Sequence, residues 1–225
     1  MTSPAATVQD LTLSDDHVYR VEGRIVPGVT EIISNVRSGY RYQVSEWHLQ
    51  RGAAVHRAVQ LAAGGKLDME RWKSDLLAAM EPPLAAAIIG RTKAAMKFLT
   101  EHMQADKTMT EIRLHNAPLN YAGTCDALGP DKEGRLLLVD WKSDLNAWVE
   151  PQLGFYSLAL KIRPQRAAGV QLMDSGEFRV RWGTRRPKRD SAQFDLDHAE
   201  RVAQAMLTAR NFLIKNSLLT IGETP

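Results

Sequence analysis

An aliphatic run that ends in charged residues constrains this chain more than any other feature of its sequence. Residues 136–142 read LLLVDWK, so four aliphatic side chains lead directly into Asp140, Trp141 and Lys142. A short run of this kind that follows a turn residue such as Gly134 is typical of a β-strand. Side chains alternate along a strand, so Asp140 and Lys142 share one face while Trp141 points to the other. The strand therefore ends with an acid and an amine side by side.

The preceding segment adds a second acid to this pair. With a turn centred near Lys132, residues 120–128 and 135–142 form an antiparallel hairpin in which paired residue numbers sum to roughly 265 or 266. This register sets Asp126 opposite Asp140 or nearly so. Facing carboxylates destabilise a sheet, and a divalent cation would compensate for that. Two carboxylates make the open site that Mg²⁺ prefers, and such a site suits phosphodiester hydrolysis.

The same residues have a simpler explanation. Asp140 and Lys142 could form an ion pair at the end of a surface strand, and Asp126 could be an ordinary acid beside a turn. An acid and a lysine two residues apart are common in proteins, so further motifs are needed to separate the two interpretations.

Hydrophobic periodicity predicts one domain over residues 1–225, with a mainly helical part over 1–105 and the catalytic sheet with its flanking helices over 106–225. No linker or repeat divides the chain. The elements expected in chain order are a strand pair within 17–26, a short helix from Thr30, a helix over 46–63, a helix after Pro82-Pro83 from 84 to about 103, strands over 110–115, 120–128 and 135–142, a helix over 149–162, strands over 169–173 and 178–182, and a helix from 195 or 197 to 213.

Composition excludes several classes of protein. The chain is 44% hydrophobic and 24% charged, which is typical of a folded protein with a sizeable core. A single cysteine, Cys125, cannot hold an iron–sulfur cluster or close an internal disulfide, and it indicates a reducing compartment. No nucleotide-binding glycine loop, nucleophile elbow or HExxH pair occurs. No membrane segment or export signal is recognisable, so we expect a cytoplasmic protein.

The densest positive charge lies in RVRWGTRRPKR, residues 179–189. The overall charge of +3 is too small to indicate nucleic-acid binding, which depends on local clustering. Here a basic strand and loop could follow a phosphate backbone while an aromatic ring stacks on a base. The predicted contacts are Arg179, Arg181, Trp182, Arg185 and Arg186. The alternatives are a solvated loop and a core position for Trp182.

Asp126 followed by Asp140, Trp141 and Lys142 resembles the signature of the PD-(D/E)XK nuclease superfamily. Four further features, in matching order and spacing, are similar to its RecB-like and phage-type exonuclease branch. They are Gly52-Ala53-Ala54-Val55-His56 as a GxxxH helix, Glu111 at the opening of the first strand, Gly123 before Asp126, and Gln152-Leu153-Gly154-Phe155-Tyr156 as a QxxxY helix. The resemblance covers roughly residues 29–160.

The resemblance implies a role for each matching residue. The metal ligands would be His56, Asp126, Asp140 and the backbone carbonyl of Trp141. The catalytic set would be Asp126, Asp140, Lys142 and Glu111. In this set Lys142 would position or polarise the attacking water, and Glu111 would be the outer acid. Gln152 and Tyr156, four residues apart on one helix face, would contact DNA.

The resemblance also implies an α/β fold with a restriction-endonuclease-like core, in which a small mixed sheet is flanked by helices and preceded by a helical N-terminal elaboration. The implied activity is Mg²⁺- or Mn²⁺-dependent DNA hydrolysis by an exonuclease in recombination, repair or phage DNA processing. DNA ends or single strands are the expected substrate. A recombinase, annealing protein or helicase partner and an oligomer are compatible with it. A non-catalytic nucleic-acid-binding or assembly subunit is the alternative, and RNA as substrate is left open.

Overall fold

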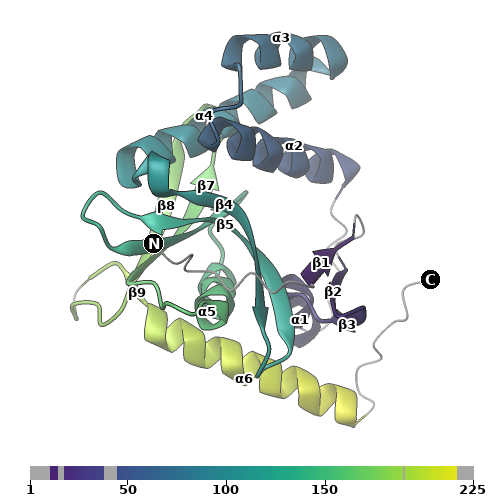
Figure 1. Cartoon of the computed structure of the whole chain (residues 1–225), viewed down its shortest axis with the longest axis vertical. Helices are drawn as coiled ribbons and strands as arrows, with labels where there is room; N and C mark the ends of the chain where they lie inside the picture. The colour runs from purple at the N-terminus through teal and green to yellow at the C-terminus, as the bar shows by residue number, and fades with distance from the viewer. Residues whose placement is uncertain (1–10, 15–17, 38–44, 190, 217–225) are drawn as a thin grey trace.

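A mixed β-sheet forms the centre of the protein (Figure 1). The computed structural model describes residues 11–14, 18–37, 45–189 and 191–216. Over these residues the sheet has six strands, which follow one another across it in chain order: β4 (Met109–Asn116), β5 (Tyr121–Pro130), β6 (Leu136–Lys142), β7 (Arg166–Leu172), β8 (Phe178–Thr184) and β9 (Phe194–Asp195). The β6–β7 and β8–β9 pairs are parallel, and the other three pairs are antiparallel.

Helices cover both faces of this sheet. One face packs against α1 (Val29–Val36), α5 (Val149–Ala159) and α6 (Leu196–Lys215). The other packs against α2 (Glu46–Ala63) and α4 (Pro82–His102), and α3 (Met69–Ala79) lies on α4. The remaining elements are a short 3₁₀ helix (Ala105–Lys107) and a small antiparallel sheet of β1 (Leu11–Leu13), β2 (Tyr19–Val21) and β3 (Arg24–Val26). This arrangement confirms the expected restriction-endonuclease-like α/β class.

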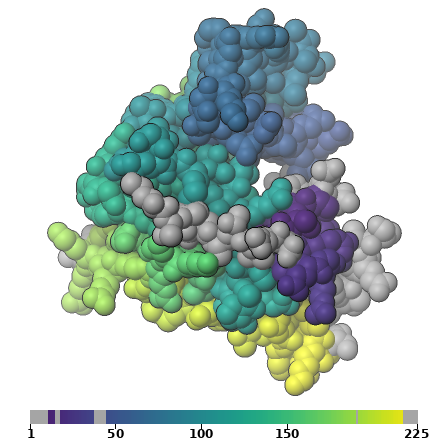
Figure 2. Space-filling view, in the orientation of Figure 1, coloured from purple at the N-terminus to yellow at the C-terminus, as the bar shows by residue number. Residues whose placement is uncertain are grey.

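The two helical layers lie on opposite sides of the strands in the space-filling view as well. Figure 2 shows the α2–α4 layer in blue above the teal strands and α6 in yellow along the opposite side. The surface is indented between α2 and the small β1–β3 sheet in this view. The end of the sheet that α2 reaches is where the predicted charged residues lie.

Burial on both faces explains the aliphatic run of β6. Leu137 and Val139 belong to the core beneath α2 and α4, whereas Leu138 belongs to the core beneath α5 and α6. Because the strand is covered on both sides, apolar residues are favoured at every position and not only at every second one. The predicted alternation holds at the end of the strand, where Trp141 packs into the α4 side with Phe98.

The predicted hairpin register between β5 and β6 is confirmed. The four paired positions run from Pro130↔Leu136 to Ala127↔Val139, so paired residue numbers sum to 266. Regular pairing stops at Ala127↔Val139, one position before Asp126 and Asp140. The two acids therefore lie where the strands begin to separate.

Two predicted boundaries were wrong by three residues. Helix α5 ends at Ala159 and not at residue 162, and β7 begins at Arg166 and not at residue 169. The reason is the same for both, because the chain must leave the helix early to reach the sheet. The Gln165 amide already donates to the Leu136 carbonyl at 3.0 Å, and Arg166 pairs with buried Asp131.

Sequence periodicity did not reveal α3 or the strands β1 and β9. Helix α3 buries only Leu76, so its hydrophobic pattern is weak, and its start depends on Asp68, which caps the Arg71 amide. The helix over 46–63 and the hairpin between β2 and β3 lie where they were expected, whereas α4 begins at Pro82 and so includes the two prolines that were expected to precede it. Residue 17, where that strand pair was expected to begin, lies outside the described residues.

Gly154 allows α5 and α6 to approach closely, and its replacement tests that contact. A Cβ atom at this position would lie 2.3 Å from the Ala199 carbonyl oxygen, and backbone cannot move aside as a side chain can. We expect Gly154→Ala to reduce the free energy of unfolding by about 2 kcal/mol, measured by urea denaturation. Gly52→Ala in α2, where a Cβ meets nothing within 4 Å, should instead stabilise by about 0.5–1 kcal/mol. Equal effects of the two substitutions would contradict this explanation.

Candidate active site

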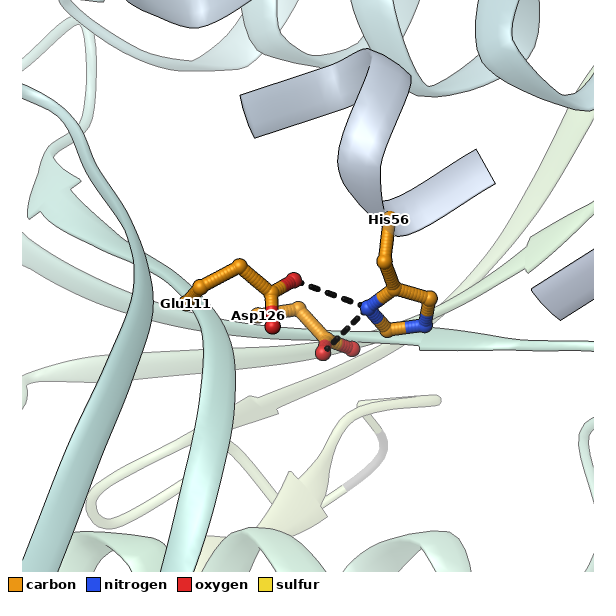
Figure 3. A group of neighbouring side chains, drawn as sticks. All are labelled: His56, Glu111 and Asp126. Atoms are coloured by element: carbon orange, nitrogen blue, oxygen red, sulfur yellow. Dashed lines mark hydrogen bonds and ion pairs between the residues drawn. The ribbon is translucent and has the colours of Figure 1, made fainter. Parts of the chain in front are cut away.

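Three side chains from separate elements meet at one end of the sheet. His56 projects from α2 toward Glu111 on β4 and Asp126 on β5 (Figure 3). The His56 Nδ1 atom lies 2.8 Å from Glu111 Oε1 and 3.2 Å from Asp126 Oδ1. One donor atom from each residue lies within 4.8 Å of the other two. His56 is 55 or more positions from both acids in the chain, and the packing of α2 on the sheet brings the three side chains together.

The backbone is strained at Glu111, the third residue of β4. Its φ is +53°, a left-handed backbone conformation that residues other than glycine rarely adopt. The β4–β5 ladder pairs Thr110 with Ala127 and Ile112 with Cys125 but skips Glu111. Such strain costs of the order of 1–3 kcal/mol and concentrates at functional sites. Here it occurs at the residue whose carboxylate meets the histidine.

The Asp126 carboxylate is held in the gap where β5 and β6 separate. Its Oδ2 atom accepts a hydrogen bond from the Trp141 amide, and its Oδ1 atom faces His56. The residue is 5% exposed. A buried carboxylate needs partners of this kind, because burial without them is unfavourable. Cys125, the preceding residue, is fully buried on the α5 side, as expected for a small core residue.

The charges in this cluster reinforce one another. Burial lowers the pKa of His56, but the charge of Asp126 and the bonds to Asp126 and Glu111 outweigh it and hold the pKa well above its ordinary value. Burial raises the pKa of Asp126, but His56 outweighs this and keeps it below its ordinary value. Protonated His56 and the carboxylates beside it therefore stabilise one another.

A second group of polar residues adjoins the first. The Lys142 ammonium contacts the Asp140 carboxylate and donates to Gln152 Oε1 at 2.9 Å, and Gln152 Nε2 donates to the Tyr156 hydroxyl at 2.8 Å. The predicted pair on α5 thus reaches the lysine at the end of β6. Burial raises the pKa of Asp140 to about 7, while Lys142 opposes this shift and Asp126 adds to it. The two acids of the sequence motif therefore influence each other electrostatically.

Gly123 allows Tyr156 to occupy its place against β5. A Cβ atom on Gly123 would lie 2.7 Å from Tyr156 Cε1 and 3.0 Å from Val29 Cγ2. Tyr156 is 4% exposed, and burial raises the pKa of its hydroxyl well above the ordinary value. The glycine that precedes Asp126 in the sequence motif therefore has a packing role in orienting the tyrosine.

The donor set fits a divalent cation. Two carboxylates and one imidazole suit Mn²⁺, and the carboxylates also suit Mg²⁺. A cation there would lie between the two acids and His56, and the imidazole would bind it in its neutral form. The close group consists of His56, Glu111 and Asp126, whereas Asp140 lies outside it and contacts Lys142. A cation shared by Asp126 and Asp140, with the Trp141 carbonyl as a further ligand, stays a prediction.

The basic residues of β8 and the loop after it are divided between the two faces of the sheet. Trp182 packs against Phe98, and the Arg166 guanidinium lies 4.3 Å from its ring centroid, so the core alternative is the one the contacts favour. Arg181 points to the opposite side and pairs with Glu150. Arg179 and Arg186 are exposed and form no ion pair within the described ranges. A role of these two in DNA binding stays a prediction.

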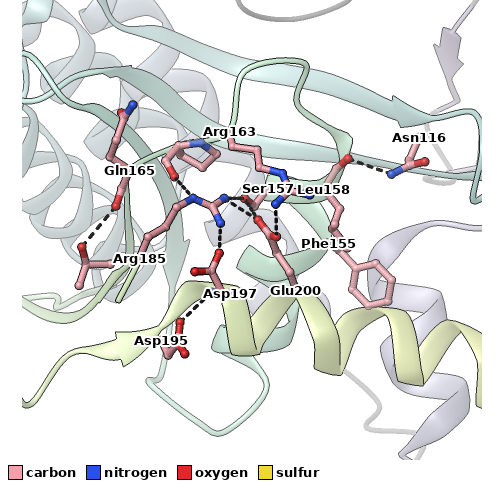
Figure 4. Close-up of polar contacts among 12 residues, drawn as sticks. Asn116, Phe155, Ser157, Leu158, Arg163, Gln165, Arg185, Asp195, Asp197 and Glu200 are labelled. Carbon is pink, nitrogen blue, oxygen red and sulfur yellow. Dashed lines mark hydrogen bonds and ion pairs between the residues drawn. The ribbon is translucent and has the colours of Figure 1, made fainter. Parts of the chain in front are cut away.

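Arg185 lies within a network that joins α5, α6 and the loop after β8 (Figure 4). Its guanidinium pairs with Asp197 and, at 2.6 Å, with Glu200, and it donates to the Pro164 carbonyl at 2.9 Å. Glu200 is 5% exposed and also accepts a hydrogen bond from the Ser157 hydroxyl at 2.6 Å. These internal partners neutralise its charge and argue against the predicted phosphate-binding role of Arg185, which stays a prediction.

Two arginines near the site were missed by the sequence reasoning. Arg51 on α2 and Arg91 on α4 line a pocket together with His56, Lys142 and Ser143. Arg51 directly precedes the GxxxH motif and shares the buried face of that helix with Val55. A charged residue at such a position was the signal that could have identified it. Arg91 belongs to no sequence motif, so only the packing of α4 brings it to the pocket.

A comparison with family models places these features in a known context. The model of the PD-(D/E)XK nuclease superfamily matches residues 34–218, which is more than half of the chain. None of the curated proteins compared with the chain matches it closely enough to count as a relative. Within the described residues, no helix combines the length and apolar character that crossing a bilayer requires.

Proposed function

The chain belongs to the PD-(D/E)XK nuclease superfamily, and from this membership we propose that it is a metal-dependent deoxyribonuclease that degrades DNA from its ends. The observation that carries the proposal is the meeting of His56, Glu111 and Asp126 beside Lys142. The participation of a helix histidine and the Gln152–Tyr156 pair favour the RecB-like exonuclease branch. The processes that this likeness suggests are recombination, repair or phage DNA processing.

His56, Glu111 and Asp126 are proposed to hold Mg²⁺ or Mn²⁺, with Asp140 and the Trp141 carbonyl on the adjoining strand as further ligands. A divalent cation in such a site supplies charge that neutralises the phosphodiester and favours ionisation of water. Glu111, which reaches His56 from a strained backbone, would set the orientation of the imidazole or contact the ion through water. The Trp141 amide fixes the Asp126 carboxylate, so that this acid cannot rotate away.

Lys142 is proposed to act directly on the reacting groups. Its ammonium has three donors, of which one contacts Asp140 and another Gln152, so the third is directed by these two partners. That donor would hold the attacking water or a phosphate oxygen, and it would stabilise charge that develops in the transition state. The Tyr156 hydroxyl holds Gln152 and so keeps the lysine in this position.

Digestion of DNA that is labelled at its ends tests the proposal. With Mg²⁺ or Mn²⁺ present, the protein should release nucleotides from linear DNA and leave covalently closed circular DNA intact. Lys142→Ala should reduce the rate by about a hundredfold, which separates this activity from contaminating nucleases. Cleavage of the circular DNA would identify an endonuclease, and intact linear DNA under all metals would contradict catalysis. RNA of the same sequence serves as the comparison substrate.

A further inference from the structure

Two arginines converge on one hydroxyl group beside the proposed catalytic lysine. Arg51 Nη2 lies 3.4 Å from Ser143 Oγ, and Arg91 Nη1 lies 3.2 Å from the same oxygen. Ser143 directly follows Lys142 at the end of β6, and Gln171 donates to its carbonyl at 3.1 Å. The two guanidinium groups are therefore fixed at the end of the catalytic strand by two different helices, α2 and α4.

The two arginines carry more positive charge than the one carboxylate paired with them neutralises. Arg51 is 6% exposed, and within the described residues it forms no ion pair with a carboxylate. Its guanidinium lies 4.5 Å from the centroid of the Trp47 ring, which packs against it without neutralising it. Arg91 pairs with Asp174 at 2.6 Å, so two guanidinium groups share one carboxylate. Burial and the charge of Arg91 both lower the pKa of Arg51, which reflects the same imbalance.

The backbone packs closely beside Arg91 and leaves space beside Gly52. A Cβ atom on Gly90 would lie 1.8 Å from the Asp174 carbonyl oxygen, so α4 and the β7–β8 turn are in direct contact next to Arg91. A Cβ atom on Gly52, which also lines the pocket, would meet nothing within 4 Å. Buried like charges are unfavourable unless an anion joins them, and a planar guanidinium is well suited to a phosphate.

We propose that Arg51 and Arg91, with the Ser143 hydroxyl, bind a phosphate group of the DNA strand next to the phosphate that is cleaved. The inference rests on the proposed function for the position of the reacting phosphate. Lys142 and His56 line the same pocket, so a strand that passes them presents its neighbouring phosphate to the two arginines. That phosphate is either a terminal 5′-phosphate or an internal phosphodiester, and both offer the same anionic oxygens.

Binding measured without metal tests this inference apart from catalysis. Fluorescence anisotropy in EDTA would compare two fluorescein-labelled duplexes, one with a 5′-phosphate and one with a 5′-hydroxyl. Arg51→Gln and Arg91→Gln should each weaken binding by about tenfold or more. Each should also reduce the slope of log affinity against log salt concentration by about 0.7–0.9. The matched controls, Arg57→Gln on α2 and Lys93→Gln on α4, remove an exposed charge from the same helices.

The two duplexes distinguish the sources of the phosphate. A loss confined to the 5′-phosphorylated duplex identifies a terminal phosphate, and an equal loss on both identifies an internal phosphodiester. Losses no larger than those of the two control variants overturn the inference. Arg51→Lys, which keeps the charge but loses the planar guanidinium, should bind DNA with intermediate affinity. Arg91 is less buried than Arg51, so Arg91→Gln still tests the inference if Arg51→Gln does not fold.

This experiment also separates the inference from the proposed function. If the variants lose binding but the wild-type protein cleaves no DNA with any metal, the phosphate site stands and the nuclease proposal fails. If the wild-type protein cleaves DNA and both glutamine variants bind as the controls do, the nuclease proposal stands and the phosphate site is rejected.

Discussion

Asp126→Asn is expected to reduce DNA cleavage by at least about a thousandfold, which corresponds to about 4 kcal/mol of transition-state stabilisation. Asp126 is the buried acid that connects the His56–Glu111 cluster with the β6 strand end. Asparagine keeps the shape of the side chain and can still accept a hydrogen bond from the Trp141 amide, but it lacks the negative charge. The fold should therefore persist while the proposed metal site is lost, as seen in single-turnover cleavage and in calorimetric titration with Mn²⁺.

Asp144→Asn is the matched control, since it removes an exposed acid two residues after Lys142. This variant should bind Mn²⁺ and cleave DNA as the wild-type protein does. If Mn²⁺ binds equally to the wild type and to Asp126→Asn, the assignment of Asp126 as a ligand is wrong. If no Mn²⁺ binding depends on any of these carboxylates, a non-catalytic nucleic-acid-binding or assembly subunit becomes the better interpretation.

Arg185→Met is expected to destabilise the fold by about 3 kcal/mol, because it leaves the buried Glu200 carboxylate and its neighbour Asp197 without the cation that now joins them. The guanidinium also satisfies the Pro164 carbonyl, which would lose its donor. The loss should appear as a lower midpoint in urea unfolding with an unchanged dependence on urea concentration. DNA affinity of the folded protein should change little.

Arg186→Met provides the comparison, because this neighbouring arginine is exposed and belongs to the same basic stretch. Its effect on stability should stay within about 0.5 kcal/mol. If Arg185→Met is instead as stable as Arg186→Met and binds DNA markedly more weakly, Arg185 has the phosphate-binding role that the sequence predicted. Its ion pairs with Asp197 and Glu200 would then contribute little to stability.

The features that the sequence predicted well depend on neighbouring residues. The register of the hairpin follows from turn position and strand alternation, and these local rules suffice to place both Asp126 and Asp140 one position beyond the last β5–β6 pair. Helix α2 likewise begins after Ser45 and ends before Gly64, as its local signals indicate. By contrast, α3 has too few buried residues for its periodicity to be visible, and the end of α5 depends on where β7 joins the sheet.

The local signals alone placed an acid–lysine pair at the end of a buried strand, because side-chain alternation and turn geometry act over only a few residues. Only the tertiary structure decided that His56 contacts Glu111, that Arg185 is neutralised by Glu200, and that the charge of Arg51 is left without a carboxylate among the described residues. Each charged side chain pairs with whichever group packing brings within reach, and that competition is among residues remote in the chain. A basic stretch or a lone histidine therefore has the same appearance in the sequence whether its charge is neutralised inside the protein or remains available to DNA.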